Sequence, residues 1–188
     1  MAVLPIRIWG DPALHAPAAP VGSVTDEIRS LVADMYDTMD AAPGVGLAAP
    51  QVGVALRVFT YAYEDDDGRP WRGEILNPEL WMVPLVPGAP DEDDESEGCL
   101  SFPGERFPLR RSERAVVTGT TLDGAAVRID VDGWRARILQ HEFDHLDGVI
   151  YVDRLAPEHA KIAHKIAKKR RWGVPGHSWL PGVDDVDA

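Results

Sequence analysis

Residues 138–146 are Ile138-Leu139-Gln140-His141-Glu142-Phe143-Asp144-His145-Leu146, and this run says most about the fold and chemistry of the chain. It contains no Gly or Pro and its apolar residues recur at helical spacing, so it predicts a helix. His141 and His145 are four residues apart and therefore share one face of that helix. Two imidazoles so placed can hold one metal ion, and Glu142 beside them can take a proton from a water that the metal activates.

The expected helix extends beyond this run, from Trp134 to Asp147, and Gly148 is placed to end it. Asp144 and Asp147 lie close enough to the histidines in sequence to orient the imidazoles by hydrogen bonds. This context favours a metal-binding helix over a structural helix whose histidines only form hydrogen bonds.

Cys99 is the favoured third metal ligand. A catalytic metal site commonly has three protein ligands and one open position, and the helix supplies only two. A lone cysteine is usually a small buried hydrophobe, but this one follows a glycine in the loop-like segment Glu97-Gly98-Cys99-Leu100-Ser101. The competing histidines lie in terminal or basic segments and are less well placed: His15, His159, His164 and His177.

Composition limits the class of protein. With 188 residues, 45% of them apolar, the chain suits one domain with a core of ordinary size. No apolar run approaches the roughly 20 residues that a membrane span needs, and the N-terminus lacks the pattern of a secretory signal. A single cysteine excludes an intrachain disulfide and favours a cytoplasmic location. The net charge of −12 argues against a protein that coats nucleic acid, so we expect no membrane and no DNA partner.

The remaining patterns predict further helices and strands. One helix begins after Thr25, a suitable N-cap, and ends before Pro43. Two alternating runs, 115–121 and 125–131, flank an Asp-Gly turn and predict a β-hairpin. Another helix extends from about residue 156 to residue 171.

Short strands are also expected at 75–78 and 81–83, broken by prolines such as Pro78. The fold class is therefore α+β, with short, mostly antiparallel strands around a central metal-binding helix and one helix towards each end of the chain. We expect one catalytic domain over residues 1–172. The Gly-, Pro- and Asp-rich residues 173–188 are expected to form a flexible C-terminal tail.

A third segment of interest is Gly44-Val45-Gly46-Leu47-Ala48-Ala49-Pro50-Gln51. Its glycines and small side chains allow the backbone of a ligand to approach closely. Such a loop suits a place where a peptide lies flat and the Gln51 amide donates to a carbonyl oxygen. It has no phosphate-loop lysine, so nucleotide binding is not supported. Taken alone, the segment is better explained as an ordinary connection between a helix and a strand.

Taken together and in this order, segments 44–51, 97–101 and 140–145 resemble the motifs of the peptide deformylases of the bacterial type. The resemblance extends over roughly residues 3–170. It implies removal of the N-formyl group from the N-terminal methionine of newly made proteins, with release of formate. The acidic residues before Glu97 and the chain after Trp172 have no counterpart in the pattern that we recognise.

The resemblance also implies a metal site. Cys99, His141 and His145 would hold the ion, with a water in the fourth position, and Glu142 would act as general base and then general acid. The metal would be Fe²⁺ in the cell, with Zn²⁺ or Ni²⁺ as alternatives. Ligand chemistry alone does not choose between them.

The resemblance assigns substrate contacts as well. The side chain of Gln51 and the backbone N–H of Leu100 would stabilise the oxyanion. The backbone of Val45, Gly46 and Gly98 would hold the nascent formyl-Met polypeptide in an extended form.

Two alternatives remain at this point. A zincin-type metallopeptidase would use the same histidine motif but take its third ligand from downstream residues, of which Asp153, Glu158, His159 and His164 are available. A non-catalytic ribosome-associated module with a structural metal is suggested by the basic segment from Lys161 to Arg171, which contains six Lys or Arg and no acid. In a deformylase, the same basic helix would be a candidate contact with the ribosome.

Overall fold

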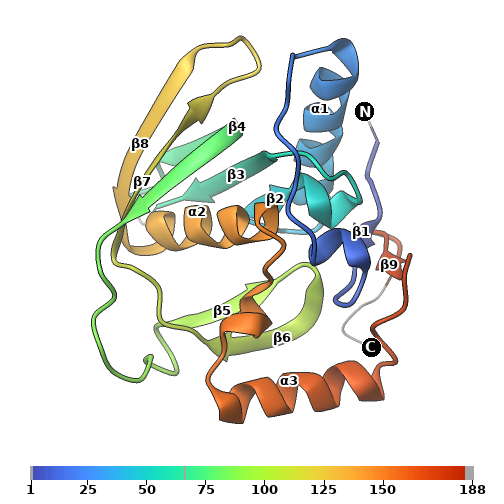
Figure 1. Cartoon of the computed structure of the whole chain (residues 1–188), viewed down its shortest axis with the longest axis vertical. Helices are drawn as coiled ribbons and strands as arrows, with labels where there is room; N and C mark the ends of the chain where they lie inside the picture. The colour runs from blue at the N-terminus through green and yellow to red at the C-terminus, as the bar shows by residue number, and fades with distance from the viewer. Residues whose placement is uncertain (1, 66, 185–188) are drawn as a thin grey trace.

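The computed structural model describes residues 2–65 and 67–184 of the chain, which form an α+β fold. Within this part, a five-stranded antiparallel sheet has the strand order β2-β3-β4-β7-β8, and two further pairs are β5-β6 and β1-β9. Figure 1 shows helix α2 across the middle of the molecule, between the large sheet and the β5-β6 pair. The α+β prediction with a central helix is confirmed.

The α-helices are α1 (Asp26–Ala41), α2 (Gly133–Leu146) and α3 (Pro157–Lys169), and the 3₁₀ turns are η1 (Pro12–Leu14), η2 (Ala49–Val52) and η3 (Tyr151–Arg154). The strands are β1 (Ile6–Arg7), β2 (Gly46–Ala48), β3 (Val58–Glu64), β4 (Pro70–Met82), β5 (Ser96–Cys99), β6 (Phe102–Pro108), β7 (Arg114–Thr120), β8 (Ala126–Asp132) and β9 (Ser178–Trp179). None of the helices in the described part is long and apolar enough to cross a membrane.

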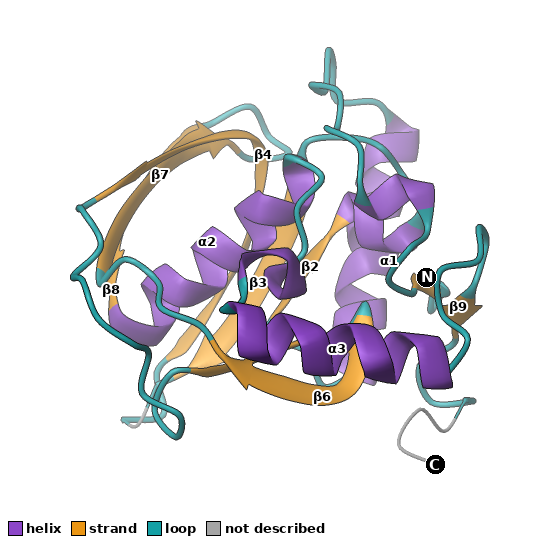
Figure 2. Cartoon of the chain, turned by 60° about the horizontal axis from the view of Figure 1, so that its bottom comes forward, coloured by secondary structure: helices purple, strands orange, loops and turns teal. Residues whose placement is uncertain are grey.

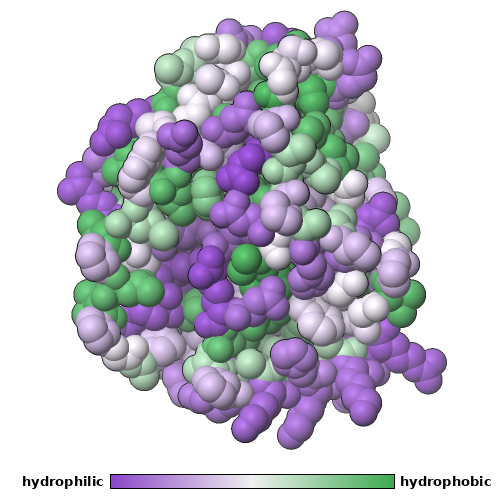
Figure 3. Space-filling model, viewed as in Figure 1, coloured by the Kyte–Doolittle hydropathy of each residue, from purple (hydrophilic) through white to green (hydrophobic). Residues whose placement is uncertain are grey.

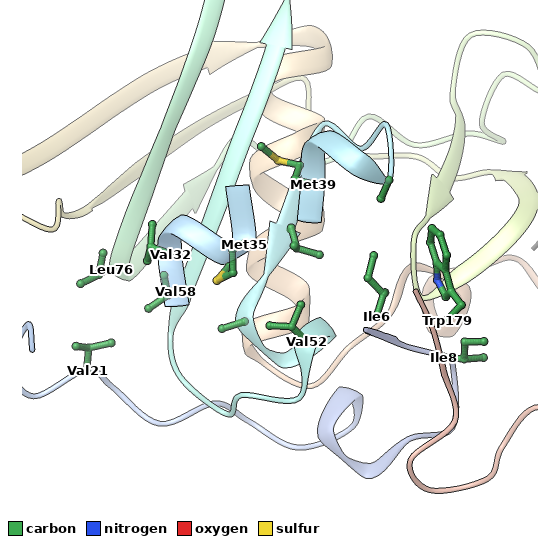
Figure 4. Packing of buried hydrophobic residues seen from close by; sticks show 13 residues of the cluster. Ile6, Ile8, Val21, Val32, Met35, Met39, Val52, Val58, Leu76 and Trp179 are labelled. Atoms are coloured by element: carbon green, nitrogen blue, oxygen red, sulfur yellow. The ribbon is translucent and has the colours of Figure 1, made fainter. Parts of the chain in front are cut away.

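Helix α1 forms as the sequence predicts. The hydroxyl of Thr25 accepts a hydrogen bond from the backbone N–H of Ile28, which satisfies one free donor of the first turn. Val32, Met35 and Met39 recur on one face and are buried in the first hydrophobic cluster, whose side chains point towards one another in Figure 4. This packing fixes the helix beside β2 and β3.

The β7–β8 hairpin is also confirmed, with Thr120 opposite Ala126 and a positive φ of 78° at Gly124 in the turn. The expectation of short strands broken by Pro78 is wrong, because β4 runs without interruption for 13 residues. The strand accommodates the proline at a register shift between Leu76 and Glu79, where no ladder hydrogen bond is needed from it.

Helix α2 is the most deeply buried helix in the described part of the chain, with 10 of its 14 residues buried. Its apolar side chains Ile138, Leu139 and Leu146 pack against Phe59 and Ile75 of the large sheet. With the helix held against the sheet in this way, His141 and His145 are directed towards Glu97 and Cys99 of β5.

The segment after residue 172 differs from the flexible tail that the sequence predicts. Ser178–Trp179 forms β9 and pairs with β1, so that Trp179 lies opposite Ile6. The indole of Trp179 is buried in the first hydrophobic cluster, and its Nε1–H donates to the carbonyl of Leu100 at 2.9 Å. Residues 185–188 of the expected tail lie outside the described residues. The domain boundary at residue 172 stays a prediction.

Candidate metal centre

Three side chains that can bind a metal converge between β5 and α2. The Sγ atom of Cys99 lies 3.3 Å from Nε2 of His145, and the two Nε2 atoms of His141 and His145 lie 3.2 Å apart. All three side chains are buried, and their ligand atoms lie within 4.8 Å of one another. The structure thus brings together the three residues that the sequence singled out as candidate ligands.

These distances fit a small divalent ion. Tetrahedral coordination, with metal–nitrogen bonds of about 2.0–2.1 Å and a metal–sulfur bond of about 2.3 Å, separates the ligand atoms by roughly 3.3–3.6 Å. Among the described residues, no other group of three His, Cys, Asp or Glu side chains converges in this way. The downstream ligands expected of a zincin, such as His159 and His164, are not part of the cluster.

Glu97 orients the first histidine. Its Oε1 lies 2.6 Å from Nδ1 of His141, on the side of the ring away from Cys99 and His145. Such a hydrogen bond fixes the tautomer and the orientation of a metal-binding imidazole. The sequence missed this role, although residues 97 and 99 alternate to the same buried side of β5 and so carried a signal for it.

The expectation that Asp144 and Asp147 orient the imidazoles is therefore wrong. The carboxylate of Asp144 instead pairs with Arg111 and Arg154. Asp147 pairs with Arg57 at 2.7 Å. Asp144 lies on the helix that carries the histidines and Asp147 is its C-cap, but both side chains are paired with arginines instead.

Burial and neighbouring charges change the pKa values of this centre. Burial alone would raise the pKa of Glu97, but the charge of Arg111 and the hydrogen bond from His141 hold it well below its usual range. For His141, burial is outweighed by Cys99 and Glu97, so its pKa is raised. For His145, burial and the charge of His141 lower the pKa. Burial raises the pKa of Glu142 to about 7.

A cavity of about 490 Å³ opens onto this centre. All of the site residues expected from the sequence, except His145, line it: Val45, Gly46, Gln51, Gly98, Cys99, Leu100, His141 and Glu142. The sequence did not predict the contributions of Trp134, Arg137 and Trp179 to its wall. Their side chains reach the cavity only because α2 and β9 are placed beside β5, and no local pattern marks them.

The model of the family described as polypeptide deformylase matches residues 3–161, which is more than half of the chain. The chain belongs to the peptide deformylase family. It is 54% identical over 187 residues to the peptide deformylase of Rhodococcus opacus, with 97% of this chain and 95% of that protein covered. It is 52% identical to the peptide deformylase of Mycolicibacterium paratuberculosis, over 97% of this chain and 96% of that protein.

Solved peptide deformylase structures share the fold. The crystal structure from Legionella pneumophila is 35% identical and has a TM-score of 0.76, covering 90% of this chain and 96% of that one. The resemblance drawn from the three motifs is confirmed, as is the interpretation of the chain as an enzyme that removes the N-formyl group from newly made polypeptides. The zincin-type alternative is not supported, because the third donor beside the histidine motif is the upstream Cys99.

In this deformylase, the position of the Glu142 side chain explains why residue 46 is a glycine. A Cβ atom at position 46 would lie 2.2 Å from Oε1 of Glu142, which is closer than any real contact. The carboxylate therefore occupies the space that a side chain on β2 would fill. Its Oε2 atom is buried and has no hydrogen-bond partner among the described residues.

Proposed function

We propose that Cys99, His141 and His145 bind one divalent metal ion. The terminal formamide of formyl-Met polypeptides is hydrolysed in the cavity beside them. The convergence of one thiolate and two imidazole donors within 4.8 Å, beside a buried carboxylate, carries this proposal. When bound, the metal supplies an activated water and polarises the formyl oxygen. We propose Fe²⁺ as the ion in the cell on the basis of the family, and the mixed sulfur and nitrogen donors also suit Zn²⁺ or Ni²⁺.

Glu142 is the proposed proton carrier. Its carboxylate lies against Gly46 in the cavity wall, beside the proposed metal ligands, where it can reach a water that the metal activates. It accepts a proton from the attacking water and gives it to the amine that leaves. Formamide and water then yield formate and a free N-terminus.

Gln51 and Leu100 are proposed to stabilise the negative charge on the formyl oxygen. The side-chain Oε1 of Gln51 accepts from the backbone N–H of Ala48 at 2.8 Å, which turns Nε2 towards Cys99, with Nε2 3.7 Å from Sγ. The backbone N–H of Leu100 follows directly after the thiolate. Donors fixed before the reaction stabilise a developing oxyanion without reorganisation, and each is typically worth ~10²–10³ in rate.

The substrate backbone is proposed to lie along Val45, Gly46 and Gly98. β2 is an edge strand of the large sheet, and its free side can pair with an extended peptide. Gly46 and Gly98 both line the cavity, where their backbone groups can meet an extended peptide.

The proposal is tested by formate release from a formyl-Met-Ala-Ser peptide, with the metal content measured in every variant. Glu142→Ala is expected to retain metal and to lose ~10²–10⁴-fold in kcat, because only the proton carrier is removed. Cys99→Ser is expected to lose metal, whereas His159→Ala, at a histidine outside the cluster, keeps it. Full metal in Cys99→Ser together with loss in His159→Ala would refute this ligand set.

We also propose that α3 contacts the ribosome, where formyl-Met polypeptides emerge, in the cytoplasm. Lys161, Lys165, Lys168 and Lys169 are all exposed on α3. Figure 3 shows hydrophilic side chains gathered along the lower edge of the molecule, over this helix. Positive charge on one exposed helix suits the phosphates of ribosomal RNA.

Charge reversal at Lys165, Lys168 and Lys169 tests this contact. The triple variant is expected to bind ribosomes more weakly in a sedimentation assay and to retain its activity on a short peptide. Unchanged ribosome binding would refute the contact, and lost peptide activity would indicate a role of the helix in folding. The alternative of a non-catalytic module with a structural metal predicts a closed site of four protein ligands and no formate release from any metal-loaded sample.

A further inference from the structure

Arg137 lies on α2 one turn before His141, and only 8% of its surface is exposed. It lines the same cavity as the candidate metal ligands. A buried cation at the wall of an active site is costly unless its charge is paired, so its partners indicate what it does.

The guanidinium group of Arg137 has partners on two sides. Its Nη1 donates to Oε2 of Glu97 at 3.0 Å and to the backbone carbonyl of Leu109 at 2.8 Å. Its Nη2 lies 3.5 Å from Oε1 of Glu95. On the other side, its Cζ lies 5.3 Å from the ring centroid of Trp134, which lines the cavity and is 42% exposed.

The contacts of Glu97 show why this pairing bears on the metal site. Oε1 of Glu97 lies near Nδ1 of His141 and accepts from Arg111, while Oε2 accepts from Arg111 and from Arg137. All the hydrogen bonds of the Glu97 carboxylate are thus made with side chains. Of its two arginine partners, only Arg137 lines the cavity.

We propose that Arg137 is a positioning residue that joins the cavity wall to the metal site. It holds Glu97 in the orientation that fixes His141, and it holds the ring of Trp134 at the cavity. This inference rests on the proposed metal site but assigns a role to a residue outside the three motifs. Partners that orient a metal-binding histidine typically contribute 10–100-fold to metal affinity.

Arg135 offers a matched control on the same helix. It also pairs with a carboxylate and a tryptophan, since its Nη2 lies 3.0 Å from Asp65 and its Cζ lies 5.5 Å from the ring of Trp71. It does not line the cavity, and its carboxylate partner is Asp65 rather than Glu97. The two arginines differ in whether their carboxylate partner touches His141, and Arg135 is also the more exposed, with 32% of its side chain accessible against 10% for Arg137.

The first experiment compares metal affinity in Arg137→Met, Arg137→Lys and Arg135→Met. Metal-free protein is titrated with Zn²⁺ in competition with a coloured chelator, and thermal unfolding is recorded in parallel. The Kd for Zn²⁺ is expected to rise about tenfold in Arg137→Met and less in Arg137→Lys, which keeps a charge but not the planar fork. Arg135→Met is expected to match the wild type. Equal Kd values for Arg137→Met and Arg135→Met would overturn the proposal.

A double-mutant cycle shows whether Arg137 acts through Glu97. In a Glu97→Gln background, Arg137→Met is expected to change the Kd for Zn²⁺ by less than about twofold, because the partner that it positions has already been altered. A full tenfold effect in that background would overturn the proposal. Glu95→Gln supplies a second comparison at a more exposed partner and is expected to leave the Kd unchanged. If Glu95→Gln weakened Zn²⁺ binding as much as Arg137→Met, Arg137 would act through Glu95 rather than Glu97, and the proposal would be overturned.

The Trp134 side of the role is measured separately by steady-state kinetics with saturating metal. Arg137→Met is expected to raise KM for formyl-Met-Ala-Ser severalfold while Arg135→Met leaves it unchanged, because only the first releases the ring at the cavity. Equal KM values for the two variants would overturn the proposed role of Arg137 in holding the ring of Trp134. Absence of formate release from the metal-loaded wild type would refute the proposed function, whereas unchanged metal affinity in Arg137→Met refutes only the role of Arg137.

Discussion

Helices α2 and α3 both carry many charged residues, but the two helices differ in whether these residues are buried. In α2, 10 of 14 residues are buried, among them Arg137, Glu142 and Asp144. In α3, only Ala163 and Ala167 of 13 residues are buried, and the lysines are exposed. Figure 2 shows α3 on the outside of the molecule beside β6, whereas α2 lies within it.

The comparison shows which charged residues are linked to the proposed metal site by their contacts. The buried charges of Arg137 and Asp144 need partners, because an unpaired charge in a protein interior costs several kcal/mol. Those partners come from other elements, so the contacts that join β5, α2 and the loop before β7 include the one that orients His141. The exposed charges of α3 are hydrated and free of this requirement.

The largest effect is expected from Arg111, which lies buried between Glu97 and Asp144. Arg111→Met should lower the free energy of unfolding by about 3–5 kcal/mol, since both carboxylates lose their shared cation. Urea unfolding followed by circular dichroism measures the change. Arg114, which forks onto Asp130 on the exposed face of the sheet, is the matched control. Similar losses in Arg111→Met and Arg114→Met would show that burial does not set the value of these ion pairs.

The next effect concerns the approach of β2 to α2. In Gly46→Ala the new methyl group would overlap the carboxylate of Glu142, so this side chain must turn away from the cavity. We expect kcat for formyl-Met-Ala-Ser to fall ~10²-fold or more, as for the loss of a general base. Gly22→Ala, where nothing lies within 4 Å of the added Cβ, should leave kcat unchanged. An active Gly46→Ala variant would contradict the proposed role of Glu142.

A smaller effect is expected from the burial of Glu142 in the metal-free protein. Its pKa is raised from 4.5 to about 7 in the folded chain, so between these values the folded chain keeps a proton that the unfolded chain has released. Through this group, the free energy of unfolding of the metal-free protein therefore falls as the pH rises from about 4.5 to about 7. Glu142→Gln, which cannot ionise, should stabilise the metal-free protein by about 3 kcal/mol more at pH ~8 than at pH ~4. Thermal unfolding of both proteins across this range measures the difference, and a gain that does not depend on pH would contradict it.

The smallest effect is expected on α3. Lys165→Ala should change the free energy of unfolding by no more than ~0.5 kcal/mol, because the side chain is exposed. Ala163→Lys, on the buried face of the same helix, should be clearly destabilising, since Ala163 is only 2% exposed. If the two substitutions were equally tolerated in urea unfolding, α3 would not be packed as described.

The sequence predicted the elements whose signals are local. The spacing of His141 and His145 fixed both the helix and the metal-binding face, and the helix expected from Trp134 to Asp147 is observed one residue earlier at each end. The hairpin around Gly124 followed from its turn residues in the same way. Cys99 was found because a catalytic site with two histidines lacks a ligand, which is a chemical rather than a conformational signal.

Apart from the convergence of Cys99 with the two histidines, contacts between distant segments were not predicted. Glu97 and His141 are 44 residues apart, and Glu97 and Arg137 are 40 residues apart, so no periodic pattern links them. Their partnership depends on the packing of β5 against α2. The continuity of β4 past Pro78 was missed for a similar reason, because the pairing of β4 with β7 outweighs the local preference of the proline.

The pairing of β1 with β9 has a consequence for the synthesis of the protein itself. Ile6 and its partner Trp179, which also donates a hydrogen bond to the carbonyl of Leu100, are 173 residues apart in the chain. This wall of the cavity can therefore form only after residue 179 has been synthesised.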